Sequence, residues 1–321
     1  MGAVTETAWK EDVLAQLVAR HLKTDGGLSF QPIRTGKFNR SYFVRLDGRE
    51  VVLRIAPPPG TPVLFYEKDM MRQEPEIHRI VREKTRVPVA EILAWDFSRT
   101  LIESDYLLME KLPGLPASEL PLSRSVWNRA LEEVGQYLRQ VHAIEGPAFG
   151  YIGPHRPMEA QPSWWEAFRL MWQKLVAQIV EIGAYRPDQG AWLVEALEKR
   201  RAYFDREVSP SLLHMDIWSQ NILLDASGHV TGILDWDRAL YGDPEIEYAV
   251  LDYCGISEPA FWRGYGKERD RSPAARVRFW FYFLYEHQKY IVIRALRSGR
   301  WEEAMRYRDD CWRLAQQWFT Q

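Results

Sequence analysis

The stretch that decides the fold is residues 212–249, LLHMDIWSQNILLDASGHVTGILDWDRALYGDPEIEYA. Two short apolar runs within it flank the turn residues 226–228, a pattern that predicts a hairpin. Asp216 and Asn221 precede this hairpin, and Asp235 follows it. Because a hairpin reverses the chain, Asp235 should return to the side of Asn221. The segment therefore predicts three oxygen-bearing side chains that converge at strand ends.

Converging carboxylate and amide oxygens suit a hard cation such as Mg²⁺, which keeps water and phosphate oxygens among its ligands. Asp216 could then accept a hydroxyl proton while the metal holds a polyphosphate. Taken singly, each residue is better explained as part of a turn than as a catalytic group, because Asp, Asn and Gly are common in turns. Chance rarely assembles HxDxxxxN, an apolar hairpin, Ile-Leu-Asp-Trp and Gly-Asp-Pro in this order.

On these motifs the segment resembles the catalytic loop and metal-binding aspartate of the aminoglycoside phosphotransferase family. The family consists of ATP-dependent small-molecule kinases that resemble protein kinases in fold. The resemblance extends over nearly the whole chain and implies the cofactors ATP and Mg²⁺. It implies Asp216 as catalytic base and Asn221 and Asp235 as Mg²⁺ ligands. His214 would brace the loop, and Asp243 would cap the following helix.

A second resemblance lies near the N-terminus, in residues 36–42, Gly-Lys-Phe-Asn-Arg-Ser-Tyr. They stand between two expected strands and are similar to the family's nucleotide loop. The resemblance implies that Gly36, Asn39 and Ser41 face the phosphates of ATP. An ordinary hairpin with one glycine is the alternative interpretation of the same residues.

The strand Val51–Ile55 carries Arg54 at the position where protein kinases have their phosphate-binding lysine. Related small-molecule kinases also use arginine there, and a guanidinium offers a planar fork of donors. By the same resemblance its partner should come from a helix over residues 69–85. Glu74 matches the family's helix glutamate best, and Glu76 is the alternative.

The strand Tyr106–Leu112 resembles the family's hinge. That resemblance implies that the backbone from Glu110 to Leu112 meets the adenine edge of ATP. A buried strand that leads into a linker accounts for the same residues. Pro113-Gly114 interrupts the pattern directly afterwards, so a domain boundary is expected there.

The expected fold class is α+β, a protein-kinase-like bilobal fold. Residues 1–112 would form a nucleotide-binding lobe with a small antiparallel sheet, and residues 113–321 a mainly helical lobe with the catalytic loop and acceptor site. Expected strands of the first lobe are 28–33, 41–46, 50–56, 87–95 and 106–112, with Asp47-Gly48 as a hairpin turn and helices over 9–22 and 69–85. Expected helices of the second lobe are 123–144, 163–182, 189–204 and two within 273–319, around short strands at 211–217, 222–225 and 230–234.

Composition narrows the choice of partners. With a net charge of -2, the chain has no global basic field to hold nucleic acid or an anionic membrane. Its most apolar stretch, residues 279–285, is far shorter than the roughly 20 residues of a membrane span. The two cysteines, Cys254 and Cys311, have neither disulfide-framework nor zinc spacing, so a reducing cytoplasm is expected. The sequence does not indicate an oligomeric state.

The acceptor is a small-molecule hydroxyl that the fold alone does not select. Family members act on aminoglycosides, macrolides, choline, homoserine, methylthioribose and ketosamine sugars. Residues 257–321 carry a net charge of +5, which favours a sugar or another neutral or anionic acceptor over a polycationic aminoglycoside. Local acidic residues such as Glu286 still allow an acidic pocket, and Trp218-Ser219 resembles the fructosamine-kinase branch.

Three other functions are alternatives to a small-molecule kinase. A protein kinase is disfavoured because Asp235-Trp236-Asp237 replaces Asp-Phe-Gly and no Ala-Pro-Glu element follows. A catalytically silent nucleotide-binding regulatory protein of the same fold stays open, because Arg54 and the atypical loop depart from the kinase pattern. A metallohydrolase using His214 and Asp216 would need further ligands in a matching motif, and none stands out.

Overall fold

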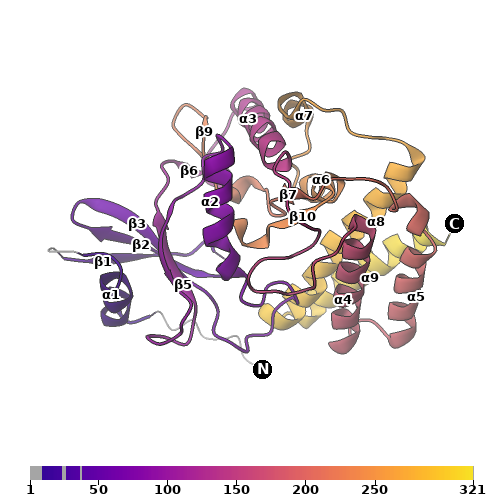
Figure 1. The fold of residues 1–321 in the computed structure, drawn as a ribbon, viewed down its shortest axis with the longest axis horizontal. Coiled ribbons are helices and arrows are strands. Elements are labelled where there is room, and N and C mark those ends of the chain that lie inside the picture. The colour runs from indigo at the N-terminus through magenta and orange to yellow at the C-terminus, as the bar shows by residue number, and fades with distance from the viewer. Residues whose placement is uncertain (1–8, 24–26, 37, 321) are drawn as a thin grey trace.

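Five strands of the N-terminal third form one antiparallel sheet in the computed structural model, which describes residues 9–23, 27–36 and 38–320. The sheet order is β1-β2-β3-β5-β4 (Figure 1). The strands are β1 (Ser29–Ile33), β2 (Arg40–Leu46), β3 (Arg49–Ile55), β4 (Ile92–Asp96) and β5 (Tyr106–Glu110). Asp47 and Gly48 both have positive φ in the turn between β2 and β3. The predicted hairpin is therefore confirmed, because a two-residue turn of this kind matches the twist of the strands.

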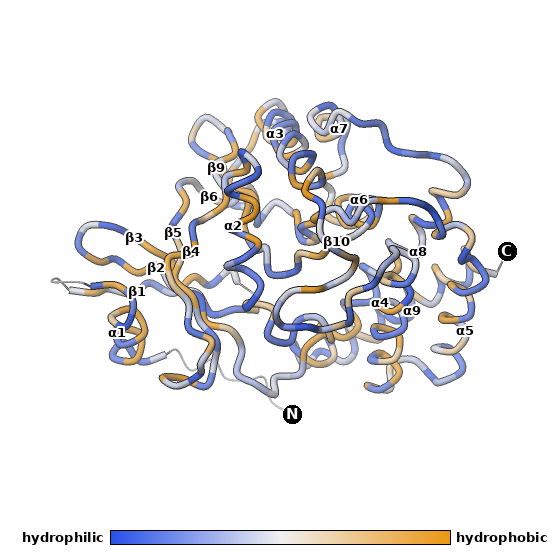
Figure 2. The backbone as a smooth tube through the Cα atoms, in the orientation of Figure 1, coloured by the Kyte–Doolittle hydropathy of each residue, from blue (hydrophilic) through white to orange (hydrophobic). Residues whose placement is uncertain are grey.

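The two faces of this sheet have different surroundings because successive side chains of a strand point to opposite sides. One face packs against helix α1 (Glu11–Ala19) through buried Val44, Leu46, Leu53 and Ile55. Figure 2 shows hydrophobic and hydrophilic segments alternating along the sheet and along α1. The alternate residues of β2 and β3 line a cavity instead; they are Ser41, Phe43, Val52 and Arg54. The period-2 pattern of two strands thus separates core from site.

The expected helix over residues 69–85 begins as a 3₁₀ turn (Met70–Gln73) and continues as α2 (Glu74–Lys84). The expected strand over 87–95 is wrong in its first half, because β4 spans only Ile92–Asp96. The carbonyl groups before it have other partners: Pro88 accepts from Ile233 N, Val89 from Arg82, and Ala90 from His78. This segment consequently joins α2 to the helical lobe.

Helices form most of the rest of the chain. They are α3 (Arg124–His142), α4 (Trp164–Glu181), α5 (Pro187–Glu198), α6 (Pro244–Tyr253), α7 (Pro259–Tyr265), α8 (Pro273–Val292) and α9 (Trp301–Phe319). Ser123, Ser163, Asp243 and Ser272 cap four of them by accepting a backbone N–H. The cap at Asp243 confirms its expected architectural part. The expected helix over 189–204 ends at Glu198, and a separate 3₁₀ turn follows.

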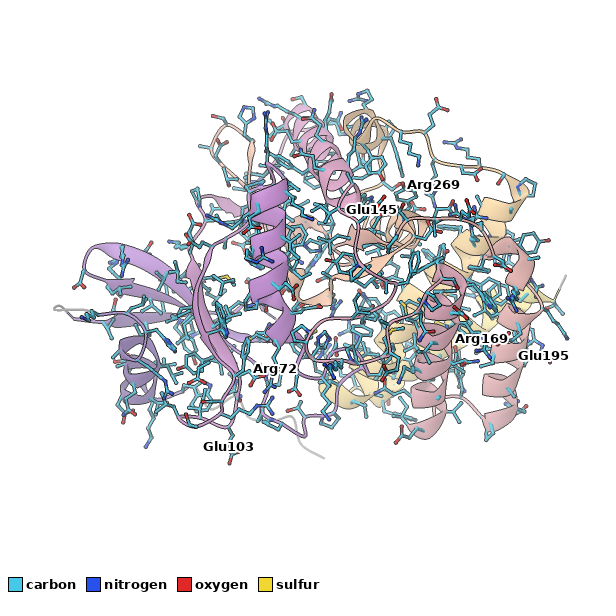
Figure 3. All side chains as sticks on the ribbon, viewed as in Figure 1. Arg72, Glu103, Glu145, Arg169, Glu195 and Arg269 are labelled. Atoms are coloured by element: carbon cyan, nitrogen blue, oxygen red, sulfur yellow. The ribbon has the colours of Figure 1, made fainter. Side chains whose placement is uncertain are left out.

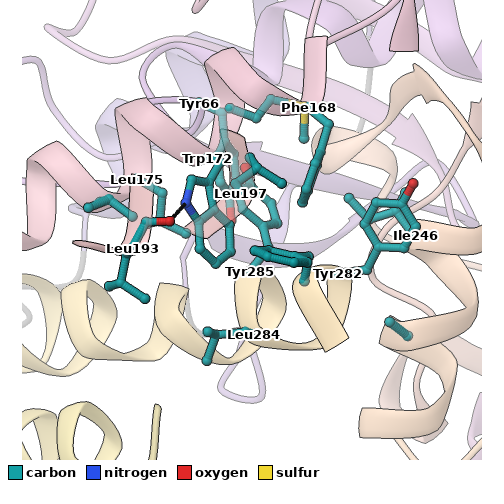
Figure 4. Packing of buried hydrophobic residues seen from close by; sticks show 14 of the residues in the cluster. Tyr66, Phe168, Trp172, Leu175, Leu193, Leu197, Ile246, Tyr282, Leu284 and Tyr285 are labelled. Carbon is teal, nitrogen blue, oxygen red and sulfur yellow. Dashed lines mark hydrogen bonds between the residues drawn. The ribbon is translucent and has the colours of Figure 1, made fainter. Parts of the chain in front are cut away.

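Aromatic side chains fill the core between α4, α5 and α8, as Figure 4 shows. Trp172 is fully buried, and its Nε1 donates to the carbonyl of Leu193 at 3.1 Å. The rings of Phe281 and Phe319 stack with centroids 3.9 Å apart and attach α9 to α8. Charged side chains such as Arg169 and Glu195 project from the outer surface of α4 and α5 (Figure 3). The abundant tryptophans of this chain therefore include buried members of a helical core.

Short strands cross the middle of the helical lobe. They are β6 (Leu115–Pro116), β7 (Ser211–Leu213), β8 (Ile222–Leu224), β9 (Val230–Ile233) and β10 (Leu240–Gly242). The hairpin of β8 and β9 is confirmed, whereas the expected strand over 211–217 ends at Leu213 because Met215 has φ of 67°. Strand β6 pairs with β8 and therefore belongs to the helical lobe. We propose that the boundary between the two lobes lies after Leu112. Among the described residues, no helix is both long and apolar enough to span a membrane.

Candidate active site

A cavity of about 1,230 Å³ lies where the sheet meets the helical lobe. The elements that line it are neighbours in Figure 1, the sheet in indigo to purple and the helical lobe in magenta to yellow. Nine of the ten site residues predicted from the sequence line this one cavity: Gly36, Asn39, Ser41, Arg54, Glu110, Leu112, Asp216, Asn221 and Asp235. The tenth, Glu74, is fully buried behind Arg54.

His214 holds the loop that carries Asp216. It is fully buried, its Nε2 donates to the carbonyl of Leu234 at 2.9 Å, and its Nδ1 accepts from Asp216 N at 3.1 Å. Burial lowers the pKa of His214, so the ring is neutral in this position. Both ring nitrogens are used, which leaves none for a metal. His214 therefore braces the loop against the segment after β9, and the metallohydrolase interpretation loses its first ligand.

Asp216 is held from two sides. Asn221 Nδ2 donates to the Asp216 carbonyl at 2.9 Å and to its Oδ2 at 3.1 Å, while Arg238 Nη1 donates to Oδ1 at 3.1 Å. The side chain keeps 16% of its surface exposed, toward the cavity. Each carboxylate oxygen can accept more than one hydrogen bond, so Asp216 retains capacity for a ligand hydroxyl.

Arg54 joins the sheet to α2 and to the segment after β9. Its Nη1 donates to Glu74 Oε2 at 2.6 Å, and its Nη2 donates to Asp235 Oδ1 at 2.7 Å and to Asp237 Oδ2 at 3.4 Å. Burial opposes the charge of the guanidinium, but the three carboxylates raise the pKa of Arg54 above its ordinary value. Of the two candidate partners on α2, Glu74 makes the contact and Glu76 lies on the exposed face.

Sequence reasoning missed two residues of this site. Asp237 is buried, accepts from Asn39 Nδ2 at 3.2 Å, and has its pKa raised by burial and by the charges of Asp235 and Glu74. Arg238 bridges Asp216 and Glu67. The repeated acid in Asp-Trp-Asp was the available signal for Asp237. No pattern pointed to Arg238, because its partners lie 22 and 171 positions away.

The oxygens around Arg54 fit a divalent cation. Burial raises the pKa of Glu74 and Asp237, whereas for Asp235 the charges of Arg54 and Arg238 outweigh burial and lower the pKa, so the negative charge beside the cavity is centred on Asp235. The hydrogen bonds of Asn221 to Asp216 use its Nδ2 and leave its amide oxygen to other ligands. The described residues contain no group of three or more His, Cys, Asp or Glu placed to bind a metal. A cation here would thus rely on few protein ligands, as Mg²⁺ at phosphates does.

The expected hinge follows β5 at the other end of the cavity. The N–H of Glu110 donates to the carbonyl of Glu91 at 2.9 Å, and its carboxylate accepts from Glu91 N and Arg82. The side chain of Glu110 is therefore engaged away from a nucleotide. Lys111 pairs with Glu50 at 2.5 Å and covers the ring of Phe43. A hydrogen bond from Glu110 or Leu112 to adenine would therefore come from the backbone.

Several curated relatives align with most of this chain at low identity. The probable ketoamine kinase of Enterococcus faecium is 25% identical over 265 residues, covering 78% of this chain and 83% of that protein. Mouse acyl-CoA dehydrogenase family member 10 is 24% identical over 278 residues, covering 79% of this chain. The match spans only 23% of the mouse protein, which is much longer.

Solved structures show the same fold. A thermostable mutant of an aminoglycoside phosphotransferase, solved as a ternary complex with AMP-PNP and hygromycin B, superimposes with a TM-score of 0.65. Its sequence is 19% identical, and the match covers 94% of this chain and 98% of that one. The expected bilobal, protein-kinase-like fold is confirmed. Nothing in these comparisons favours the catalytically silent alternative.

The family model described as the phosphotransferase enzyme family matches residues 29–280. This range begins at β1 and includes β3 with Arg54, the loop with Asp216, and Asp235. The match confirms the resemblance on which the expectation of a small-molecule kinase rested. The chain therefore belongs to the phosphotransferase enzyme family.

Proposed function

We propose that this phosphotransferase transfers the γ-phosphoryl group of ATP to a hydroxyl group of a ketoamine, a sugar derivative. The observation that carries the reaction type is the carboxylate of Asp216, held by Asn221 and Arg238 in the same cavity as Arg54. The name of the Enterococcus faecium relative supports the ketoamine acceptor.

Asp216 acts on the acceptor in this proposal. It accepts a hydrogen bond from the reacting hydroxyl and takes its proton as the oxygen bonds to the γ-phosphorus and the bond to the β-phosphate oxygen breaks. The donors from Asn221 and Arg238 keep the carboxylate in one orientation, which lowers the entropic cost of reaching the reactive geometry. ADP leaves with the bridging oxygen.

Arg54 and the β1–β2 loop act on the nucleotide. The fork of Arg54, held by Glu74, binds α- and β-phosphate oxygens, and the loop with Gly36, Asn39 and Ser41 faces the same phosphates. The backbone of Glu110 and Leu112 binds the adenine edge. Bound at Asn221 and Asp235, Mg²⁺ would neutralise charge that develops on the phosphates.

The purified full chain should release ADP from ATP in the presence of Mg²⁺ when a fructosyl amine is supplied, and mass spectrometry should find one phosphate added to the amine. A panel with aminoglycosides and choline tests the acceptor class. Asp216→Asn is the matched control, because it keeps the size of the side chain and removes the base. ATP binding without turnover of any acceptor would favour the silent alternative, and turnover of aminoglycosides alone would refute the ketoamine.

We also propose a cytoplasmic location. Cys254 and Cys311 are both free thiols in the described chain, as expected in a reducing compartment. Burial raises the pKa of Cys254, in the cavity wall, to about 12, so this thiol is protonated. Fractionation of cells that express the tagged full chain would test the location.

A further inference from the structure

The junction between α8 and α9 has an unusual backbone at the wall of the cavity. After Val292 the helix widens into a π-helical turn, Ile293–Arg297, and α9 begins at Trp301 after Gly299 with φ of 63°. Isolated π-helical turns concentrate at functional sites because they change where side chains point. This junction contributes Ile293, Arg294, Arg297, Ser298 and Arg300 to the cavity lining.

Arg297 is a donor without a sufficient acceptor. Its Nη1 is buried and makes no hydrogen bond, and Glu67 Oε1 lies 3.7 Å away. The oxygens of Glu67 already accept from Arg238 at 3.2 Å and from Leu64 N at 3.1 Å. The ring of Phe38, from the β1–β2 loop, lies 5.1 Å below the guanidinium. A buried N–H without an acceptor costs free energy, so a bound acceptor atom would be stabilising here.

Arg294 is in a similar position. Its Nε is buried without a hydrogen bond and lies 3.4 Å from Glu303 Oε2 in a longer ion pair. Glu303 also accepts from Arg300 at 3.3 Å and is 40% exposed. The half-exposed carboxylate of Glu303 is therefore the acidic partner of both Arg294 and Arg300. A guanidinium that lacks a bidentate partner is well suited to bind a carboxylate or phosphate.

Two tyrosines line the same part of the cavity. The rings of Tyr253, on α6, and Tyr290, on α8, stack with centroids 5.2 Å apart. Burial raises the pKa of Tyr290, and the charge of Glu286 raises it further while Arg238 opposes the shift. Tyr290 lines the same cavity as the proposed base, Asp216. Neutral aromatic surface with hydroxyl groups suits the uncharged, hydroxylated part of an acceptor.

We propose that the acceptor carries an anionic group, a carboxylate or a phosphate, which binds to Arg297 and Arg294 while its reacting hydroxyl lies at Asp216. This inference rests on the proposed kinase function and narrows its substrate class. Arg300 strengthens the positive field of the pocket, and the tyrosines contact the uncharged part of the acceptor. A polycationic acceptor would place like charges against these arginines, at a cost in binding.

The γ-phosphate of ATP is the other anion that Arg297 could bind, because Phe38 belongs to the nucleotide loop. The nucleotide already has Arg54 and the loop residues on the sheet side of the cavity. Arg294 and Arg300 come instead from the α8–α9 junction, on the same helices as Tyr290 and the C-terminal core. The acceptor is therefore the source of the anion in this proposal, and the experiment measures both.

The test uses two ketoamines of nearly the same shape, fructosyl-glycine with a free carboxylate and fructosyl-glycinamide with a neutral amide in its place. We expect wild-type kcat/KM to favour the carboxylate by tenfold or more. Arg297→Gln should remove most of this preference, Arg294→Gln part of it, and neither should change the KM for ATP by more than twofold. Arg313→Gln, an exposed arginine on α9 paired with Asp310, is the matched control and should keep the preference.

Binding is measured separately from turnover, as the shift in melting temperature with AMP-PNP present. If neither ketoamine is phosphorylated, the proposed acceptor is wrong. The anion-binding site is then supported if fructosyl-glycine raises the melting temperature of the wild-type chain more than fructosyl-glycinamide does. Equal effects of the two compounds on the wild-type chain, in both assays, would overturn the inference. So would a higher KM for ATP in Arg297→Gln with unchanged acceptor preference, since the anion would then be the nucleotide's. If Arg297→Gln does not fold, Arg294→Gln decides by the same criteria.

Discussion

Replacing Arg54 should impair nucleotide binding and folding to different extents, depending on the substitution. Its two terminal nitrogens make separate charge-assisted hydrogen bonds, 2.6 Å to Glu74 and 2.7 Å to Asp235. An ammonium is a compact point charge that cannot reproduce this fork. Arg54→Lys should therefore keep the charge and lose one of the directed bonds, whereas Arg54→Ala loses both and the charge.

The magnitudes follow from burial. A hydrogen bond to a charged group contributes about 1.5–3 kcal/mol, and about 1.4 kcal/mol corresponds to a factor of ten. We expect the KM for ATP to rise about tenfold in Arg54→Lys and about 100-fold in Arg54→Ala. Glu74 is fully buried, so Arg54→Ala also leaves a buried carboxyl group without its cation. Breaking a buried pair in this way costs about 3–5 kcal/mol of folding free energy.

The assay is ADP release at varied ATP, with urea unfolding of each variant. Glu74→Gln should raise the KM for ATP less than Arg54→Ala does, and the effects of Glu74→Gln and Arg54→Lys should be less than additive because the residues are in contact. Glu76→Gln is the matched control on the exposed face of the same helix. Wild-type KM for ATP in folded Arg54→Ala, or a larger effect at Glu76 than at Glu74, would refute the assignment.

Four further predictions concern catalysis, metal, packing and pH. Asp216→Asn should lower kcat at least about 100-fold with little change in ATP affinity; an unchanged kcat would remove it from the mechanism. Asp235→Asn should raise the Mg²⁺ concentration needed for half-maximal turnover, and undiminished Mg²⁺ affinity would argue against that ligand. In Gly264→Ala the new Cβ would come within 1.8 Å of a carbonyl oxygen of α3, so the free energy of unfolding in urea should fall by about 1–3 kcal/mol or more. The control Gly27→Ala, whose Cβ would have nothing within 4 Å, should leave the free energy of unfolding unchanged. Burial lowers the pKa of His78 from 6.5 to about 4, so only the unfolded chain binds this proton between those values. The contribution of His78 to the free energy of unfolding is then fully present above pH 6.5 and decreases by about 1.4 kcal/mol per pH unit as pH falls toward 4. In His78→Gln, the free energy of unfolding measured with urea should depend less steeply on pH over this range.

Local spacing determined much of this protein from its sequence. Asp216 and Asn221 are five positions apart on one loop, and a predicted hairpin returns the chain from Asn221 to Asp235. The structure has Leu234 N donating to the carbonyl of Asn221 at 2.9 Å. Short-range geometry of this kind follows from turn chemistry and strand period, both of which residue types reveal. The alternation of β2 and β3 likewise decided that Arg54 faces away from the core.

Only the tertiary structure decided which distant groups meet. Glu74 and Glu76 are both in the first turn of α2, and the rotation of the packed helix brings Glu74 to Arg54. Residues 88–90 of the expected strand 87–95 do not join the sheet, because their carbonyl groups find donors on α2 and β9. Arg297 reaches Phe38 across 259 positions of the chain. Such contacts depend on how whole elements pack against one another. The pattern of residue types along one element does not indicate which other element will cover its face.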